Sequence, residues 1–237
     1  MSAPQLLLLP GLLNDAELWR DQVRALSDVA NCTVPDLTRG ATLEDLARSV
    51  LAQARPRFAL AGFSMGGYVA QEMARLAPER IERLALLDTS IRADTPDRAR
   101  TRQALDKAAR APGRFHGFGE KLLETYLHPD NLHDQAIVAR IRGMTERLGP
   151  EVFLRQNALE RKDGTAVLGA LACPTLILCG EADALTPPAD HRAMAALVRN
   201  ARLVTVPRSG HMTPIENPDA VTAALRDWLA WTSRPGG

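Results

Sequence analysis

Short apolar segments alternate with amphipathic segments along most of this chain, and no other feature of the sequence constrains its fold as strongly. The apolar segments have the length of buried strands, and the intervening segments carry apolar residues at a helical period. Strands separated by helices pair in parallel, so the sequence predicts an α/β fold with a mostly parallel sheet flanked by helices. The expected strands are residues 5–9, 32–37, 58–63, 83–87, 175–179 and 202–206, and the expected helices between them are about 15–27, 42–54, 65–76, 189–198 and 218–231.

The alternation is interrupted between residues 91 and 171. This stretch shows no strand pattern, and helical patterns occupy residues 96–111, 119–127, 134–148 and 151–159. Because the alternation resumes afterwards, we expect the insertion to lie over one edge of the sheet as a cap. The predicted domains are a core of residues 1–90 and 172–237 and a helical cap of residues 91–171.

Charge and composition exclude several classes of partner. The 29 lysines and arginines nearly cancel the 28 aspartates and glutamates, and no long block of like charge occurs, so we expect no nucleic-acid partner. The apolar run at residues 6–9 ends at Pro10 and Gly11 and lacks a basic leader, so we expect neither a signal peptide nor a membrane span. The composition is that of a globular protein, and it does not indicate an oligomeric state.

Cysteine usage indicates a reducing compartment. The chain has three cysteines, an odd number. Cys173 and Cys179 would lie about 20 Å apart along one strand, which is too far for a disulfide. We therefore expect a cytoplasmic protein.

The segment at residues 62–67 reads Gly-Phe-Ser-Met-Gly-Gly and lies between an expected strand and an expected helix. A tight strand-to-helix turn in this place would hold the hydroxyl of Ser64 clear of the sheet. The neighbouring glycines would allow the close backbone approach that such a turn needs, and the helix N-terminus would direct amide groups at an oxyanion. The alternative is an ordinary glycine-rich turn. The strand and helix on either side favour a nucleophilic serine.

A nucleophilic serine needs a histidine base, and His211 is the candidate. It lies between the last expected strand and the last expected helix, at the same carboxyl edge of the sheet as Ser64. We expect the remaining histidines to be surface or helix-end residues: His116, His128, His133 and His191.

A carboxylate must orient the histidine, and three residues compete for this position. Asp183 follows the strand ending at residue 179, Glu181 lies in the same turn, and Asp88 follows the strand after the serine helix. On spacing, Asp183 is the preferred candidate for the carboxylate that orients His211, and Asp88 is the second candidate. The alternative interpretation of Asp183 is that it caps a helix. The resulting order is Ser64, Asp183, His211, which is typical of one of the known serine-hydrolase arrangements.

With these motifs the chain resembles the α/β-hydrolase superfamily, among its esterases, lactonases and C–C hydrolases. The resemblance covers residues 6–231, although the cap is similar only in position. It implies that the backbone N–H groups of Leu12 and Met65 form an oxyanion hole. The chain differs from many relatives in having Pro10 and Phe63 where they have histidine, and in lacking two N-terminal strands of larger relatives.

The resemblance implies a cofactor-free serine hydrolase that cleaves carboxylic esters through an acyl-enzyme. The same residues would serve lactone, thioester or C–C bond hydrolysis or perhydrolysis, and a non-catalytic small-molecule receptor is the third reading. We expect no metal, because the sequence has no paired-histidine zinc helix and no Cys-x-x-Cys pair.

Apolar residues surround the expected site, so we predict a small or hydrophobic substrate. Leu13, Phe63 and Met212 are the candidate pocket residues, although Leu13 and Phe63 are equally typical of core. No cationic anchor for the substrate is evident near these loops. The sequence leaves open which cap residue faces the pocket among Phe115, Phe118, Tyr126, Met144 and Phe153.

Overall fold

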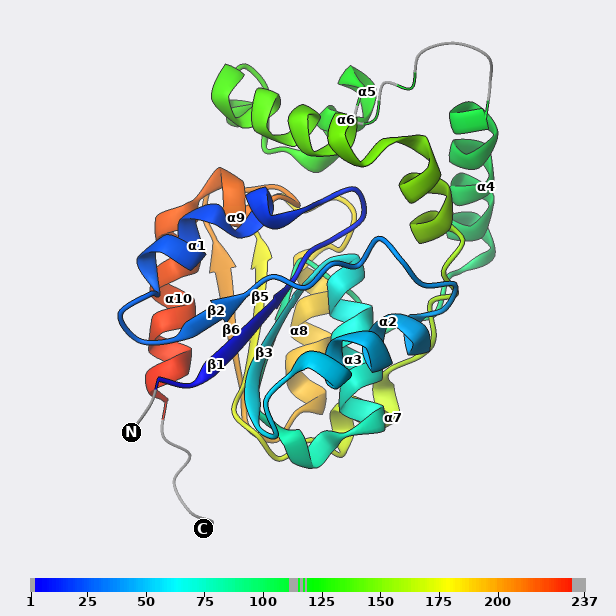
Figure 1. The fold of residues 1–237 in the computed structure, drawn as a ribbon. Helices are drawn as coiled ribbons and strands as arrows, with labels where there is room; N and C mark the ends of the chain where they lie inside the picture. Colours follow the sequence, from blue (N-terminus) through cyan, green and yellow to red (C-terminus); the bar gives the residue numbers. More distant parts are fainter. Residues whose placement is uncertain (1–2, 111–114, 116, 118, 232–237) are drawn as a thin grey trace.

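The computed structural model describes residues 3–110, 115, 117 and 119–231. Its strands are β1 (Gln5–Leu9), β2 (Asn31–Thr33), β3 (Phe58–Phe63), β4 (Ile81–Leu87), β5 (Thr175–Gly180) and β6 (Ala201–Val206). Among the described residues these strands form one sheet in the order β2-β1-β3-β4-β5-β6, in which every neighbouring pair is parallel (Figure 1). Every residue of β3 and β5 is buried, which explains their continuous apolar sequence. The predicted parallel α/β fold is confirmed.

Helices cover both faces of the sheet, and each face has its own hydrophobic core. Along β1, Leu6 and Leu8 belong to one core while Leu7 and Leu9 belong to the other, because successive strand residues point to opposite faces. The first core is covered by the 3-10 helix η1 (Ala16–Trp19), α1 (Arg20–Ala25), α9 (Thr213–Glu216) and α10 (Pro218–Ala230). The second is covered by α2 (Leu43–Gln53), α3 (Met65–Leu76), α7 (Thr165–Gly169) and α8 (Pro188–Leu197).

The helices of the insertion lie above the carboxyl edge of the sheet (Figure 1). They are α4 (Pro96–Arg110), α5 (Glu120–Tyr126) and α6 (Gln135–Asn157), with the short 3-10 helix η3 (Pro129–Asn131); another, η2 (Pro78–Arg80), precedes β4. Gly149 has a φ of 73° and is followed by Pro150, so α6 bends at the break that the sequence predicted between residues 148 and 151.

The segments that lead into and out of the insertion, near Ile91 and Gly164, lie side by side. The N–H of Gly164 donates to the carbonyl of Ile91 over 2.7 Å. Beyond this contact α7, which the sequence did not predict, packs against α3 and α8. The division of the chain at residues 90 and 171 stays a prediction.

Two elements differ from the sequence expectation. The strand expected at residues 32–37 is limited to β2, because Pro35 has no N–H for a longer pairing. The helix expected at about 15–27 is divided into η1 and α1, and it begins where the Asp15 carboxylate accepts from the N–H of Glu17. Both elements lie at or near the β2 edge of the sheet and do not contribute the site residues.

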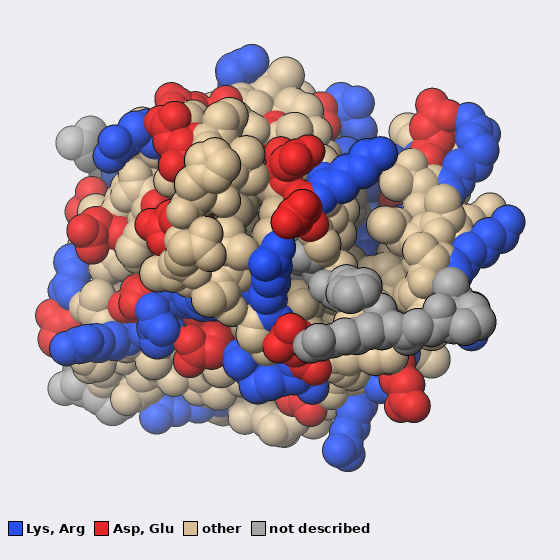
Figure 2. All heavy atoms as spheres, turned by 90° about the horizontal axis from the view of Figure 1, so that it is seen from above, with Lys and Arg blue, Asp and Glu red and all other residues tan. Residues whose placement is uncertain are grey.

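The surface above the cap carries charges of both signs. Figure 2, which looks down on this face, shows lysines and arginines interspersed with aspartates and glutamates rather than one basic patch. The expectation that no nucleic acid binds stays a prediction.

Candidate active site

Ser64 lies at the turn between β3 and α3, in the conformation that its flanking glycines permit. Its φ is 50° and its ψ is −115°, a strained backbone for a residue with a side chain. A Cβ at Gly62 would lie 2.5 Å from the carbonyl oxygen of Gly66, and one at Gly66 would lie 2.5 Å from that of Leu9. These approaches are to backbone atoms and leave no room for a side chain. The Gly-Phe-Ser-Met-Gly pattern is therefore required by the geometry of this turn.

The structure brings Ser64, His211 and Asp183 into one hydrogen-bonded chain. The Oγ of Ser64 lies 2.9 Å from Nε2 of His211, and Nδ1 of His211 lies 2.9 Å from Oδ2 of Asp183. Both His211 and Asp183 are 2% exposed, whereas Ser64 is only partly buried. The nucleophile candidate is thus open to a substrate while its two supporting residues are shielded from water.

Asp183 is held as a carboxylate by its surroundings. Its Oδ1 accepts from the N–H groups of Leu185 and Thr186 at 2.9 Å each, and its Oδ2 accepts from the Thr186 hydroxyl at 2.6 Å. Burial acts to raise the pKa of Asp183, but the His211 imidazole and the donors of Thr186 outweigh burial and leave this pKa lowered. An ionised acid in contact with Nδ1 keeps Nε2 of His211 free to accept a proton.

The two competing carboxylates do not contact His211. Asp88 is fully buried and accepts from the N–H of Gly180 at 3.0 Å and from the Thr213 hydroxyl. Burial, followed by the charge of Asp183, raises the pKa of Asp88 well above its ordinary value. Glu181 is exposed and accepts from the N–H of Arg208 at 2.6 Å.

One of the other histidines departs from the sequence expectation. His191 was expected at the surface or at a helix end, but it lies in α8 and is 0% exposed. Its Nε2 accepts from the N–H of Thr89 over 3.2 Å, and burial lowers the pKa of His191. It is a neutral core residue. His133 is exposed and His128 partly buried, and His116 lies outside the described residues.

Glu216, which the sequence analysis did not identify, fixes the loop that carries His211. Its Oε1 accepts from the N–H groups of Gly210 (2.9 Å) and Met212 (3.0 Å). Its Oε2 accepts from the N–H of His128 (2.7 Å) and from Nδ2 of Asn131 (2.8 Å), which belong to the insertion. The carboxylate therefore joins the histidine loop to the cap.

The Met65 amide lies at the start of α3, and the Leu12 amide lies in the loop after β1, whose first carbonyls closely approach Gly66. Met65 is the first residue of α3, so its N–H is among those that a helix leaves unpaired. Leu12 follows β1, and the next residue, Leu13, has a φ of 52°. The N–H of Leu13 donates over 2.8 Å to Oε1 of Gln156, a buried residue of α6 whose Nε2 donates to the carbonyl of Leu37. A cap residue thus positions the loop that carries Leu12, and no sequence motif indicated it.

A pocket of about 210 Å³ lies between the β1 loop and the cap. Of the expected pocket residues, Leu13 lines it, while Phe63 and Met212 are buried outside its lining. The ring of Phe63 instead packs 5.4 Å from the His211 ring. Among the cap residues left open by the sequence, Phe115, Tyr126 and Phe153 line the pocket, Met144 is buried and Phe118 lies outside the described residues. The full lining is Leu12, Leu13, Leu105, Ala108, Ala109, Phe115, Gly117, Leu122, Tyr126 and Phe153.

A family model described as the alpha/beta hydrolase family matches residues 6–224. The chain belongs to this family. It is also 26% identical over 192 residues to a pimeloyl-[acyl-carrier protein] methyl ester esterase of Neisseria meningitidis serogroup C, a match that covers 79% of this chain and 75% of that protein.

Two solved structures of this family are similar over nearly the whole chain. A thermophilic esterase from Thermogutta terrifontis has a TM-score of 0.84 and 31% identity, covering 97% of this chain and 90% of that one. The enol-lactonase from Burkholderia xenovorans has a TM-score of 0.85 and 27% identity, covering 98% and 93%. The predicted family, fold and hydrolase class are confirmed.

The described residues form neither a cluster suited to a metal ion nor a helix suited to cross a membrane. Among the described residues, no cluster of three or more histidine, cysteine, aspartate or glutamate side chains is arranged to hold a metal ion. In the same part of the chain, no helix has the length and apolar character needed to cross a membrane.

Proposed function

We propose that this hydrolase cleaves carboxylic esters through an acyl-enzyme on Ser64, with His211 as the base and Asp183 as the residue that orients it. The unbroken chain of hydrogen bonds from Ser64 Oγ through His211 to Asp183 carries the proposal. In this mechanism His211 takes the hydroxyl proton as Ser64 attacks the ester carbonyl. His211 then protonates the leaving alcohol, and a water molecule activated by the same imidazole hydrolyses the acyl-enzyme.

The Leu12 and Met65 amides are proposed to bind the oxyanion of the tetrahedral intermediate. Support comes from the position of Met65 at the start of α3 and from the fixed loop of Leu12 and Leu13. Amide donors that are already oriented stabilise developing charge without reorganisation, and one such donor contributes about 3 kcal/mol in comparable enzymes.

We propose that the pocket beside Leu12, Leu13 and Tyr126 takes a small apolar part of the substrate. Its lining is almost entirely aliphatic and aromatic, and its volume of about 210 Å³ suits a short acyl or alcohol chain. Esters with short chains should therefore be hydrolysed faster than long ones.

Lactone opening is the second candidate function. It uses the same nucleophile, base and oxyanion donors, and the similarity to the enol-lactonase over 98% of the chain favours it over the other bond types. A γ-lactone assayed beside the esters separates the two activities.

Three reduced cysteines support a cytoplasmic location. Cys32, Cys173 and Cys179 are all free thiols. We propose on this ground that the protein works in a reducing compartment.

Turnover of p-nitrophenyl acetate, butyrate and octanoate by the wild type and by Ser64→Ala tests the proposed function. We expect wild-type turnover with a preference for the shorter esters, and a loss of about a thousandfold or more in the variant. Equal activity of the two proteins would show that Ser64 is not the nucleophile, and saturable binding without turnover would indicate a receptor.

A further inference from the structure

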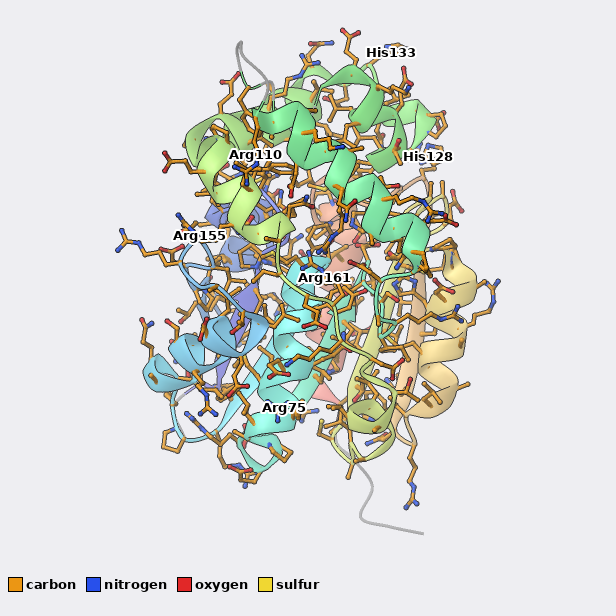
Figure 3. All side chains as sticks on the ribbon, turned by 90° about the vertical axis from the view of Figure 1, so that its right-hand side faces the viewer. Arg75, Arg110, His128, His133, Arg155 and Arg161 are labelled. Atoms are coloured by element: carbon orange, nitrogen blue, oxygen red, sulfur yellow. The ribbon has the colours of Figure 1, made fainter. Side chains whose placement is uncertain are left out.

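Arg161 lies half-buried in the segment between α6 and α7, beside Tyr68 of α3. Figure 3 shows it among the helices of the insertion and α3, whereas Arg155 is exposed and donates to the carbonyl of Thr38. Its guanidinium carbon lies 5.4 Å from the ring centroid of Tyr68, over the ring. Tyr68 is one turn after Ser64 on α3, and residues four apart share one side of a helix.

A second aromatic residue connects Arg161 to the base. Tyr126, at the end of α5, packs its ring edge-on against His211 with 5.2 Å between ring centroids, and its carbonyl accepts from the N–H of His211 over 2.7 Å. The charge of Arg161 acts on both Tyr68 and Tyr126. Arg161 therefore lies near one residue that neighbours the nucleophile and another that neighbours the base.

The positive charge at this place is only partly balanced. Arg161 and Arg102 both donate to the carbonyl oxygen of Leu159, over 2.7 Å and 2.9 Å. Arg102 also forms an ion pair with Asp94 at 3.1 Å. Among the residues that the structure describes, no carboxylate lies within ion-pair distance of Arg161, whose contacts are the Leu159 carbonyl and the Tyr68 ring.

The surroundings of Arg161 lower the pKa of its guanidinium, but the group keeps its positive charge. Burial, and then repulsion by Arg102, lower the pKa of Arg161 to about 10, so the guanidinium remains protonated at neutral pH. A carboxylate that binds beside a partly desolvated arginine without an anionic partner is strongly stabilised there. The two groups then form a paired, charge-assisted hydrogen-bonded contact.

We propose that Arg161 binds a carboxylate of the substrate, so that the preferred substrates are esters of dicarboxylic acids with one acid group free. The proposal rests on the proposed esterase function and names its substrate class. The ester carbonyl lies at Ser64, the connecting methylene groups lie against the tyrosines, and the free carboxylate pairs with Arg161. The cationic anchor that the sequence analysis did not find is thus a residue of the insertion, far from the nucleophile in sequence.

The test compares acid esters with neutral isosteres. The substrates are the monomethyl esters of succinic, glutaric and adipic acid and the corresponding mono-amides, with p-nitrophenyl butyrate as a reference. The proteins are the wild type, Arg161→Met, Arg161→Lys and the control Arg155→Met, which removes an exposed arginine of α6.

We expect the wild type to prefer the acid ester over its amide by about tenfold or more in kcat/KM for at least one chain length. Arg161→Met should abolish that preference, mainly through KM, while turnover of the amides and of p-nitrophenyl butyrate stays within about twofold. Arg161→Lys should retain part of the preference, because it keeps the charge but loses the paired donors. Arg155→Met should behave as the wild type does.

The proposal is overturned if the wild type hydrolyses acid and amide esters equally well. It is also overturned if Arg161→Met slows all substrates to the same extent and lowers the melting temperature, since Arg161 would then only support the cap. If Arg161→Met does not fold, the proposal can be tested on the wild type alone, by measuring how dicarboxylates and their amides inhibit its hydrolysis of p-nitrophenyl butyrate. Glutarate should then inhibit about tenfold more strongly than glutaramide, and equal inhibition would contradict the proposal.

A failure of the proposed function has a different signature. In that case the wild type turns over none of the esters, including p-nitrophenyl butyrate. Calorimetric titration of the wild type and Arg161→Met with glutarate still tests the anion site, with binding expected only in the wild type. Equal heats in the two proteins would contradict it.

Discussion

Two carboxyl side chains of the site differ sharply in pKa although they lie within one hydrogen-bonded region. Asp183 has a lowered pKa because His211 and Thr186 stabilise its carboxylate, whereas burial raises the pKa of Asp88. The different hydrogen-bond donors around the two acids explain the contrast. At the scale of single residues, the site therefore holds one acid with a lowered pKa that contacts the base and one acid with a raised pKa that does not.

The contrast predicts different effects of two matched substitutions on activity. Asp183→Asn should lower kcat by about a thousandfold or more with a small effect on KM, because His211 loses the acceptor that fixes its tautomer. Asp88→Asn should retain activity within about tenfold, since Asp88 contacts Gly180 and Thr213 rather than His211. Steady-state kinetics of the two variants on one short ester decides. An equal loss in both would contradict the assignment of Asp183.

The raised pKa of Asp88 also predicts how stability depends on pH. The unfolded chain releases this proton near pH 3.8, the ordinary pKa of an aspartate, while the folded protein holds it to a higher pH. The folded state thus binds more protons above that value, so its stability falls as pH rises toward the folded pKa. Asp88→Asn removes this pH-dependent loss of stability, because asparagine does not titrate. Relative to the wild type, the variant should gain stability as the pH rises above about 4, measured by urea unfolding.

A variant that becomes less stable than the wild type as the pH rises would show that Asp88 is ionised in the folded protein. The measurement at about pH 4 is the internal control, because both proteins then carry a neutral group at position 88.

At the scale of elements, α6 reaches the proposed oxyanion loop through Gln156. This side chain satisfies the N–H of Leu13 and the carbonyl of Leu37, and all three groups are buried or partly buried. The cap is thereby joined to the loop after β1 and to the segment after β2.

Replacing this residue should affect stability and activity together. Gln156→Met leaves two buried backbone groups without partners, at about 1–3 kcal/mol each. We expect urea unfolding to show a loss of about 2 kcal/mol or more, and kcat to fall about tenfold as the Leu12 amide loses its fixed position. Glu151→Gln, at an exposed position of the same helix, is the control. A destabilised variant with unchanged kcat would mean that Gln156 only attaches the cap.

The elements that the sequence predicted are those whose pattern is local. The buried strands β3 and β5 appear as continuous apolar runs, and the Gly149 and Pro150 pair marks the bend of α6. The short helices α7 and α9 were missed, because four or five residues do not show a helical period. β2 was expected too long because its pattern continued past the point where Pro35 ends the pairing.

At the scale of the whole molecule, the site is assembled from both parts of the chain. The core supplies Ser64, Asp183 and His211, whose loops meet because parallel strands end at one edge of the sheet. This convergence is general to the fold, so the three residues were predictable from the sequence. Gln156, Glu216 and Arg161 were not, because each of them contacts a segment that lies 88 to 143 residues away in the sequence.

Because the proposed nucleophile, base and oxyanion donors are all residues of the core, turnover should not depend on an added metal. We expect that dialysis against EDTA leaves kcat unchanged for the wild-type protein. A loss of activity that one divalent metal restores would contradict this mechanism, and the same treatment of a known zinc hydrolase serves as the positive control.

The central claim is that Ser64 is an activated nucleophile, and covalent labelling with a fluorophosphonate tests it most directly. Such a reagent reacts with a serine only where a base removes its proton and oxyanion donors stabilise the product. Intact-mass and peptide analysis should show a single adduct on the peptide that contains Ser64, no adduct in Ser64→Ala and strongly slowed labelling in His211→Ala. An adduct on another residue, or equal labelling of the wild type and Ser64→Ala, would contradict the account.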